Sequence, residues 1–458
     1  MVTRRPMVTR RPTVTRHLLP SDRLRSWLPL ATRPRSVLGW SFLGWRVAAS
    51  VLVMRRLARA ANVAPPLVAG SVGDSHAGAL PTISIVIPAR NEARRLAPCL
   101  AGLQSARGVV EVLVVDDESS DSTADVARRH GARVISGAAL PPGWAGKAWA
   151  LDQGIRAASA EWVVTLDADT RPRRDLPLAL VERMTLDEID FATVAGRFDC
   201  PTTGSRWLHP AMLTTLVYRF GPPGERVSGE RVSGVRPATR HSGDSSRAAG
   251  TPGAGKSPAS DGSPGSCGWP GSGNARRIQS SRDLANGQCM AARRQMWVAD
   301  GGMSAVGGAL VEDVALARHL ADRSRRVAML DGSSLLTVRM FESLADTWTG
   351  WGRSVALPGV EPLPRQLRQV AELAVTQAGP LLRLAVRRGD PLDVMLIACR
   401  LGTLVGTRRA YTRRDGAYWL SPLADVPAVA RLLVGVIRPA NSWRGRTYPI
   451  VRRPTASM

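Results

Sequence analysis

Two acidic residues separated by one residue, Asp167 and Asp169, follow the apolar run Trp162–Leu166. The run is short, rich in residues that favour β-structure and bounded by polar residues, so it predicts a buried strand. In open α/β sheets, ligands bind at the carboxyl ends of the strands. Two carboxylates there can hold a hard divalent cation, and such a cation can carry a diphosphate. The alternative interpretation is a polar turn that caps the following helix, since Asp and Thr are favoured there.

Three further polar pairs follow strand-like or turn-like positions, namely Asn91–Glu92, Asp116–Asp117 and Glu312–Asp313. If the sheet is parallel, the first two pairs share one edge with Asp167. A carboxylate within reach of an acceptor proton contributes roughly 10²–10⁴-fold to a rate, and Asp313 is the best candidate for such a base. The alternative is that Glu312–Asp313 complements the dipole at the start of a helix.

These residues need a scaffold of alternating strands and helices, and the sequence predicts one. Strand patterns alternate with helix patterns, which is typical of a parallel sheet flanked by helices and places the chain in the α/β class. The expected strands are 83–88, 111–116, 133–136, 162–166 and 288–291, and the expected helices are centred on 96–103, 121–131, 148–158 and 311–323.

The net charge of +25 comes almost wholly from arginine, in a chain of 458 residues. A basic chain suggests a nucleic-acid partner, but few aromatic residues are interleaved as stacking platforms. Anionic lipid is therefore the more economical partner, and no specific nucleic acid is expected. The five cysteines lie far apart, which argues against a zinc site or a disulfide framework and fits a reducing compartment.

The composition of the N-terminal part predicts a basic disordered tail over residues 1–35 and a membrane-associated helix over residues 36–60. The helix pattern has Arg46 at its middle, which costs roughly 2.5–3.5 kcal/mol on the insertion scale, while each large apolar residue returns about 0.3–0.6 kcal/mol. The sum is close to zero, so the segment could span a bilayer or lie in its interface. Arg55, Arg56 and Arg59 are expected to anchor its end to anionic headgroups.

The rest of the chain divides into a catalytic domain over 80–345, membrane-associated helices over 365–440 and a tail over 441–458. The alternative for 365–440 is an amphipathic helical domain, because each apolar stretch is short or interrupted by charge. A low-complexity insert over 222–282 lacks the apolar content to fold alone. Inside it, Gly250–Ser257 satisfies the P-loop pattern literally, but it lacks the preceding strand and following helix that a P-loop needs.

Four segments resemble, in order and spacing, the family 2 glycosyltransferases with a GT-A fold, over roughly residues 82–345 without the insert. They are Ser84–Glu92 (SIVIPARNE), Val114–Thr123 (VVDDESSDST), Asp167–Asp169 (DAD) and Glu312–Asp313 (ED). Further segments resemble the membrane-associated branch that includes hopene-associated and carotenoid (diaponeurosporenoate) glycosyltransferases. These are Leu140–Ala150, Ala285–Cys289, Gly308–Ala317 and Trp443–Tyr448.

The resemblance implies an inverting transfer from a nucleotide-sugar, most often a UDP-sugar, to a lipid-like acceptor such as a carotenoid or hopanoid. Asp169, helped by Asp167, would hold Mg²⁺ or Mn²⁺ on the diphosphate, and Asp313 would deprotonate the acceptor. Lys147 and Arg353 would lie near the donor. The residues expected to border the nucleotide are Pro88, Ala89, Glu92 and Asp117.

The segment with Trp348, Trp351 and Arg353 resembles the one that closes over the donor in related synthases, but the Gln-x-x-Arg-Trp form is missing, which argues against a processive polymerase. Alternatives are transfer to polyprenyl phosphate or a polysaccharide, and an inactive scaffold that binds anionic lipid or nucleic acid. The resemblance implies a cell-membrane protein whose catalytic domain faces the cytoplasm, where nucleotide-sugars are found.

Overall fold

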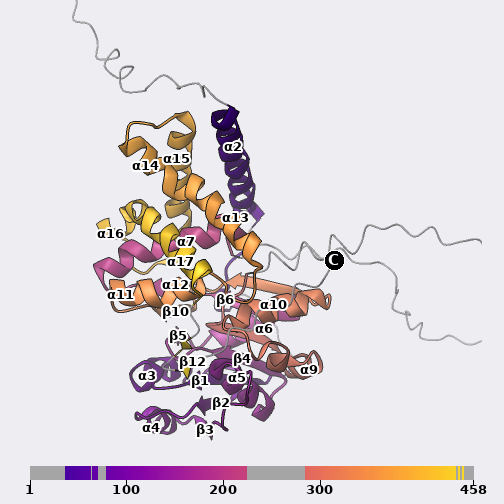
Figure 1. The fold of residues 1–458 in the computed structure, drawn as a ribbon. Coiled ribbons are helices and arrows are strands. Elements are labelled where there is room, and N and C mark those ends of the chain that lie inside the picture. The colour runs from indigo at the N-terminus through magenta and orange to yellow at the C-terminus, as the bar shows by residue number, and fades with distance from the viewer. Residues whose placement is uncertain are drawn as a thin grey trace, which may run out of the picture.

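The structure is a computed structural model that describes residues 37–62, 64–70, 79–223 and 284–439, with two short strands near the C-terminus, β11 (Ser442–Trp443) and β12 (Arg446–Thr447). An α/β part carries the main sheet, and helices α2, α14 and α15 rise from it on one side (Figure 1). The predicted tail 1–35 and most of the predicted insert 222–282, including the P-loop-like segment, lie outside the described residues. So does most of the tail 441–458.

Seven strands form the main sheet in the order β3-β2-β1-β4-β8-β6-β9. Strand β1 pairs in parallel with both β2 and β4, and β6 pairs in parallel with β9. Strand β8 lies between β4 and β6 and runs antiparallel to both. The expected α/β fold with a mostly parallel sheet is therefore confirmed. The strand bounds are β1 Ile83–Ala89, β2 Val109–Asp116, β3 Arg133–Ser136, β4 Trp162–Leu166, β6 Phe191–Ala195, β8 Cys289–Arg293 and β9 Val327–Asp331.

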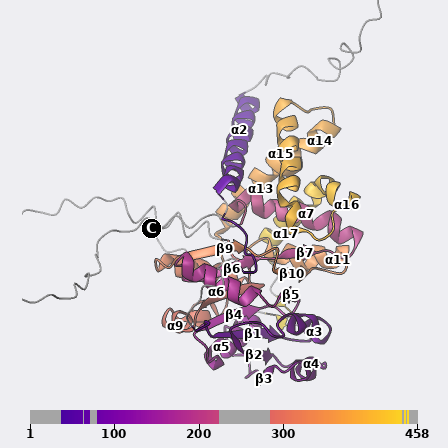
Figure 2. The same ribbon diagram turned by 180° about the vertical axis from the view of Figure 1, so that it is seen from behind.

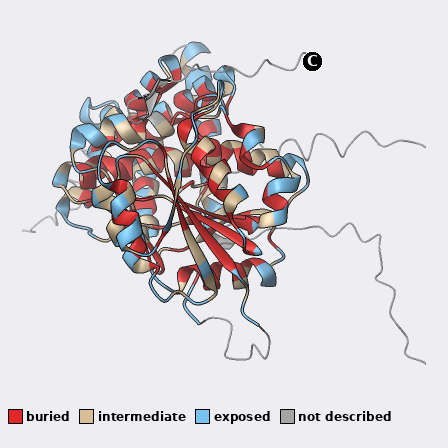
Figure 3. Cartoon of the chain, turned by 90° about the horizontal axis from the view of Figure 1, so that it is seen from below, coloured by how far each residue is buried: buried red, intermediate tan, exposed pale blue. Residues whose placement is uncertain are grey.

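The central strands are covered on both faces, since every residue of β1 and of β4 is buried. Figure 3 shows these strands in red between layers of helix. Parallel strands read as continuous apolar runs because helices pack on both sides of them. Close packing of α5 requires Gly154, because a Cβ there would lie 2.4 Å from Val86 Cγ1. The covering helices are α3 Ala93–Gly102, α4 Thr123–Arg129, α5 Gly146–Ala157, α6 Leu176–Leu186, α9 Arg294–Ala299 and α10 Glu312–Asp322.

A small second sheet links the α/β part to the helices. Its strands are β5 (Thr170–Pro172), β10 (Leu336–Arg339) and β7 (Arg197–Asp199), with β10 in the middle. Strand β10 runs antiparallel to β5 and parallel to β7. The sheet thus joins the segment after β4 to the start of the long helix α7 (Thr203–Phe220).

The C-terminal helices pack around α7 and α2 (Val37–Leu57). Figure 2 shows α2, α14 and α15 from behind, standing away from the main sheet. Among the described residues, one helix, Val37–Ala60, is long and apolar enough to cross a membrane. The C-terminal helices are α11 Leu344–Asp346, α12 Gly352–Ser354, α13 Leu363–Leu373, α14 Gly379–Ala385, α15 Pro391–Thr407, α16 Gly416–Trp419 and α17 Asp425–Ile437, with short π-helical turns at Thr347–Trp351 and Ala374–Ala378.

Arg46 is buried in the structure, with 2 % of its side chain exposed. Its guanidinium pairs with Asp390, with a nitrogen to oxygen distance of 2.5 Å, and with Asp393. Arg383 reaches the same two carboxylates at 3.1 and 3.0 Å. The charge in the middle of α2 is thus neutralised by the start of α15.

Arg56 also differs from the expectation of a headgroup anchor. Its guanidinium turns into the protein, where it lies 3.1 Å from Glu372 and donates to the carbonyl of Tyr218 at 2.9 Å. Burial against α7 and α13 therefore takes the place of a lipid contact at this residue.

Candidate functional site

The parallel strands bring the predicted acidic pairs to one edge of the sheet. Ala89 at the end of β1 lies opposite Asp116 at the end of β2, and the N–H of Asp117 donates to the carbonyl of Ala89 at 2.9 Å. Strand β4, which ends at Leu166, lies on the other side of β1. The expectation that these strand ends share one edge is therefore confirmed.

At the β1–β2 end of this edge, a basic side chain lies over the acids. Arg90 donates to the carbonyl of Asp117 and lies 3.8 Å from its carboxylate. The backbone N–H of Glu92 donates to Thr123 Oγ1 at 2.9 Å, which fixes the loop after β1 against α4. Asp117 is buried, with 3 % exposed. Pro88, also predicted to border a nucleotide, is buried within β1.

At the β4 end, Lys147 joins two acids that are far apart in the sequence. Its Nζ lies 2.9 Å from Asp167 Oδ1 and 2.9 Å from Glu312 Oε1. Burial opposes the charged amine, but the carboxylates of Asp167 and Glu312 outweigh burial and raise the pKa of Lys147 above its ordinary value. Lys147 therefore stays protonated and balances two carboxylates at once.

Asp167 and Asp169 are held by the backbone around them. The N–H of Asp167 donates to the carbonyl of Gln288 at 3.0 Å, and the carbonyl of Asp169 accepts from the N–H of Arg339 at 3.0 Å. Burial raises the pKa of Asp167 to about 6, with the charge of Asp169 adding to the rise and Lys147 opposing it. The turn thus has a fixed backbone while its two carboxylates keep partly exposed side chains.

Asp313 lies in the first turn of α10, and both of its carboxylate oxygens accept backbone hydrogen bonds. Gly287 N–H donates to Oδ2 at 2.6 Å, and Val314 N–H donates to Oδ1 at 2.8 Å. Burial raises the pKa of Asp313 to about 7, and the neighbouring charge of Glu312 adds to the rise. A Cβ at position 287 would lie 3.2 Å from both Asp313 and Lys147 Nζ, so a glycine lets this loop approach the acids. A carboxyl with a pKa in this range can take up a proton near neutrality.

A cavity of about 1370 Å³ connects these groups. Lys147, Asp167, Asp169 and Glu312 line one region of it together with Asp313. Pro88, Ala89, Glu92 and Asp117 lie at the same sheet edge but outside the lining of this cavity. The structure thus brings the predicted metal, base and lysine positions together and leaves the predicted nucleotide border beside them.

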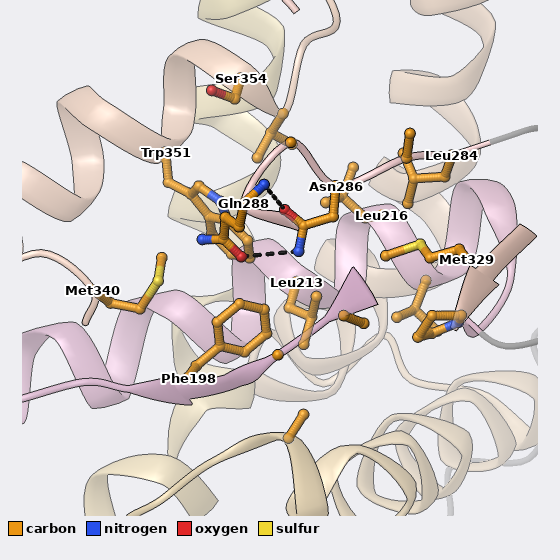
Figure 4. A pocket seen from close by; sticks show the side chains of 18 of the residues that line it. Phe198, Leu213, Leu216, Leu284, Asn286, Gln288, Met329, Met340, Trp351 and Ser354 are labelled. Carbon is orange, nitrogen blue, oxygen red and sulfur yellow. Dashed lines mark hydrogen bonds between the residues drawn. The ribbon is translucent and has the colours of Figure 1, made fainter. Parts of the chain in front are cut away.

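The wall away from the acids is largely apolar. Figure 4 shows aromatic, Leu and Met side chains from several elements around one space. Asn286 and Gln288 are polar exceptions and bind each other, with the amide of Asn286 donating to Gln288 Oε1 at 2.8 Å. The apolar side chains labelled there are Phe198, Leu213, Leu216, Leu284, Met329, Met340 and Trp351. One space therefore offers both a charged and an apolar lining.

Of the segment predicted to close over the donor, Trp351 lines this cavity and stacks on His209 with ring centroids 3.8 Å apart. Arg353 lies in α12, which follows directly, and its side chain is outside the described part of the structure. Trp348 lies within 5.9 Å of the guanidinium of Arg431 on α17. The segment is thus fixed to α7 and α17 at the apolar side of the cavity.

Within the described residues, no group of three or more His, Cys, Asp or Glu side chains could hold a metal ion. Proteins commonly hold Mg²⁺ with one or two carboxylates, while substrate phosphates and water fill the remaining coordination positions. The predicted ligands Asp167 and Asp169 would supply such a set. The oxygen donors therefore fit a cation that arrives with a phosphorylated ligand.

Sequence reasoning did not assign functional roles to several residues of the site. Arg95 and Arg339 line the cavity as further cations, and Gly287 orients Asp313. Gly287 lies in a segment quoted only for its resemblance, Ala285–Cys289. The pair Asn286–Gly287 stands just before a predicted strand, and an Asn-Gly pair is a turn signal that could have indicated this loop.

Residues 84–238 match the family model described as glycosyl transferase family 2. This match confirms the predicted resemblance to family 2 glycosyltransferases over three of the four segments, while Glu312–Asp313 lies beyond the matched residues.

Two curated relatives are both 4,4'-diaponeurosporenoate glycosyltransferases. That of Staphylococcus haemolyticus (strain JCSC1435) is 39 % identical over 90 residues, which is 19 % of this chain and 24 % of the relative. That of Staphylococcus aureus (strain MRSA252) is 38 % identical over 106 residues, which is 23 % of this chain and 28 % of the relative. The matches thus span less than a third of the length of these relatives.

Among solved structures, a mannosyltransferase from Pyrobaculum calidifontis in complex with GDP-Man and Mn²⁺ is similar, with a TM-score of 0.46 and 15 % identity over 86 % of this chain and 97 % of that one. Glucosyl-3-phosphoglycerate synthase from Mycobacterium tuberculosis, solved with Mn²⁺, UDP and glucosyl-3-phosphoglycerate, has a TM-score of 0.35 and 18 % identity over 60 % of this chain and 78 % of that one.

Proposed function

We propose that this chain, which contains a family 2 glycosyltransferase domain over residues 84–238, is an inverting glycosyltransferase that moves a sugar from a nucleotide-sugar to a lipid-like acceptor. The donor is a UDP-sugar in the simplest form of the proposal. The observation that carries it is the single cavity whose lining is acidic at Asp167, Asp169 and Asp313 and apolar over α7 and the Trp351 segment. A sugar donor with a diphosphate suits the first region, and a hydrocarbon acceptor suits the second.

The donor would lie along the sheet edge. Its nucleotide would border Pro88, Ala89, Glu92 and Asp117, and its diphosphate would extend toward Lys147, where Arg353 follows in the closing segment. Asp169, with Asp167, would hold Mg²⁺ or Mn²⁺, and such an ion stabilises the negative charge of the leaving diphosphate. Lys147 supplies a fixed positive charge beside the same place, which favours the charge that develops as the sugar leaves.

Asp313 would be the general base. In the transfer, the acceptor oxygen forms a bond to the anomeric carbon, the bond from that carbon to the diphosphate oxygen breaks, and the acceptor proton moves to Asp313. Attack from the face opposite the diphosphate inverts the anomeric centre. The hydrogen bonds from Gly287 and Val314 fix the carboxylate in place, so that little reorganisation is needed when the proton moves.

The acceptor is proposed to be a terpenoid such as a carotenoid or hopanoid. The curated relatives are named for 4,4'-diaponeurosporenoate, and this supports an elongated hydrocarbon acceptor here. The apolar helix Val37–Ala60 supports a place at the cell membrane, where such a molecule dissolves. The catalytic domain is proposed to face the cytoplasm, because nucleotide-sugars are made there.

The test is a screen of donors and acceptors with the full chain in membranes. Labelled UDP-glucose and other nucleotide-sugars are supplied with a lipid extract, and products are identified by mass spectrometry. We expect a glycosylated lipid from the native chain and none from Asp313→Asn, while UDP binding, measured by calorimetry with Mn²⁺, is retained in both. Absence of labelled lipid with every donor, beside an active relative as control, would refute the proposal.

A further inference from the structure

The cavity that holds the acids continues to the two helices that stand away from the sheet. Met54 and Leu57 of α2 line it on one side, and Cys399, Gly402 and Gly406 of α15 line it on the other. We call the space between these five residues the α2–α15 slot. The thiol of Cys399 is the one ionisable group among these five residues, and Thr403, Thr407 and Arg409 also line the cavity from the end of α15 and the turn after it.

Two contacts hold α2 against α15, one beyond the slot and one between two of its lining residues. Arg46 pairs with Asp390 and Asp393 at the start of α15, and Met54 Sδ lies 3.2 Å from Cys399 Sγ further along. Both helices then continue toward the main sheet, and in this last part the cavity lies between them. The slot is thus framed by fixed contacts.

Glycine keeps the slot open. A Cβ at Gly402 or at Gly406 would have no protein atom within 4 Å, and neither glycine has a positive φ. Close packing and backbone conformation therefore do not require glycine at these positions, although glycine is unfavourable in the interior of a helix. Their spacing of four residues puts both on the same face of α15. Both glycines are exposed and line the cavity, so a larger side chain at either position would take up part of its volume.

The outer surface beside the slot is apolar. Val47 and Val51 of α2 are 46 % and 52 % exposed, and Leu401 and Val405 of α15 are 47 % and 49 % exposed. Side chains of this kind are stable in contact with lipid. A hydrocarbon chain could pass from the bilayer into the slot without entering water.

We propose that the α2–α15 slot admits and holds the hydrocarbon chain of the acceptor, and that Gly402 and Gly406 set how thick that chain can be. The occupant is one rod-like or unbranched chain, whose head group reaches the region of Asp313 through the continuous cavity. The identity of the acceptor as a sugar-accepting lipid rests on the proposed function, whereas binding of the chain does not need catalysis.

The test measures binding of trans-parinaric acid, a rod-like polyene fatty acid, to the full chain in detergent by native mass spectrometry. Gly402→Leu and Gly406→Leu fill the slot, and Gly402→Ala fills it only slightly. Gly44→Leu is the matched control, because Gly44 is an exposed glycine of α2 that also has no atom within 4 Å of a Cβ and does not line the cavity. Thermal unfolding shows that each variant is folded.

We expect the native chain and Gly44→Leu to retain one equivalent of the probe, and each Leu variant in the slot to need at least about tenfold more probe for half occupancy, since the added side chain takes the volume of the bound chain. Gly402→Ala should lie between them. No retained probe with the native chain, or equal retention in all variants, would overturn the proposal. The proposal would also be overturned if the native chain formed a dimer and only the slot variants lost it. Gly402 and Gly406 would then serve the packing of helices between two chains.

If the probe binds but the donor screen yields no product, the proposed function is contradicted, while the proposal that the slot binds a hydrocarbon chain is still supported. If the Leu variants glycosylate the acceptor as well as the native chain does, the proposed role of the slot is contradicted, while the proposed function is still supported.

Discussion

At the scale of single residues, the charge balance of the site depends on Lys147. Its amine contacts Asp167 and Glu312, and Asp313 lies close enough to influence its pKa. Three acids so close together would repel one another strongly without a cation among them. The sequence predicted roles near the donor or the acceptor for Lys147, Asp167 and Asp313. It could not show that Lys147 joins Asp167, 20 positions away, to Glu312, 165 positions away.

The first prediction concerns pH. A general base works when it is ionised, and burial together with Glu312 raises the pKa of Asp313 to about 7. The value of kcat/KM should therefore rise with pH through about 7 and fall about tenfold for each unit below it. Initial rates of sugar transfer between pH 5 and 9 measure this. An acid limb centred near pH 4, the ordinary range of a carboxyl, would remove Asp313 from the role of base.

The second prediction concerns Lys147→Met, which removes the cation and keeps most of the side-chain volume. Lys147 lowers the pKa of Asp313. Its loss should shift the acid limb of the pH profile upward by about one unit or more, as expected for the removal of an opposite charge at short range. Lys147→Arg keeps the charge and is the control. An unchanged limb in Lys147→Met would show that the amine does not act on the base.

At the scale of elements, local patterns were sufficient for the first half of the sheet. Strands β1 to β4 and helices α3 to α5 follow the predicted order, because parallel strands and amphipathic helices have distinct periodicities. The antiparallel insertion of β8 between β4 and β6 was not predictable, since its pairing depends on contacts between distant segments. The same holds for α7, which supplies Leu213 and Leu216 to the apolar wall of the cavity.

The third prediction concerns the pairing of α2 with α15. Arg46→Ala leaves the fully buried carboxylate of Asp393 with Arg383 alone. Breaking a buried pair by removing one partner costs about 3–5 kcal/mol, because a buried charge loses its counter-charge. We expect a clearly lower temperature of unfolding for the full chain in detergent.

Arg55→Ala is the control for this change, since Arg55 is an exposed residue of the same helix and surface charges contribute little. A second variant, Arg46→Leu with Asp393→Asn, should recover part of the loss. Equal unfolding temperatures for Arg46→Ala and Arg55→Ala would mean that the pair does not hold the two helices together.

At the scale of the whole molecule, one cavity is built by parts that lie far apart in the sequence. Gly221, Pro222 and Pro223 at the end of α7 line it, and so do Leu284 to Gln288 where the described chain resumes. Both ends of the interval 224–283 are therefore held by the folded protein. The repetitive composition of that interval was recognisable from the sequence.

The fourth prediction follows from this placement. Replacement of residues 224–283 by a short Gly-Ser linker should leave the unfolding temperature within about 3 °C of the full chain, since the loop-closure entropy changes little with length. Glycosylation of the lipid acceptor should also persist. Loss of UDP binding in the shortened chain would instead assign part of the donor site to the removed residues.

The pairing of Arg46 also determines an order of events during synthesis of the protein. Asp390 follows Arg46 by 344 positions, so the ribosome completes the whole α/β part before the counter-charge exists. Until then α2 carries an unpaired charge at its middle, and a helix of that kind inserts poorly into lipid. Pairing of α2 with α15 is therefore a late step that begins when α15 leaves the ribosome. A chain cut off before residue 390 would keep α2 with an uncompensated charge at its middle.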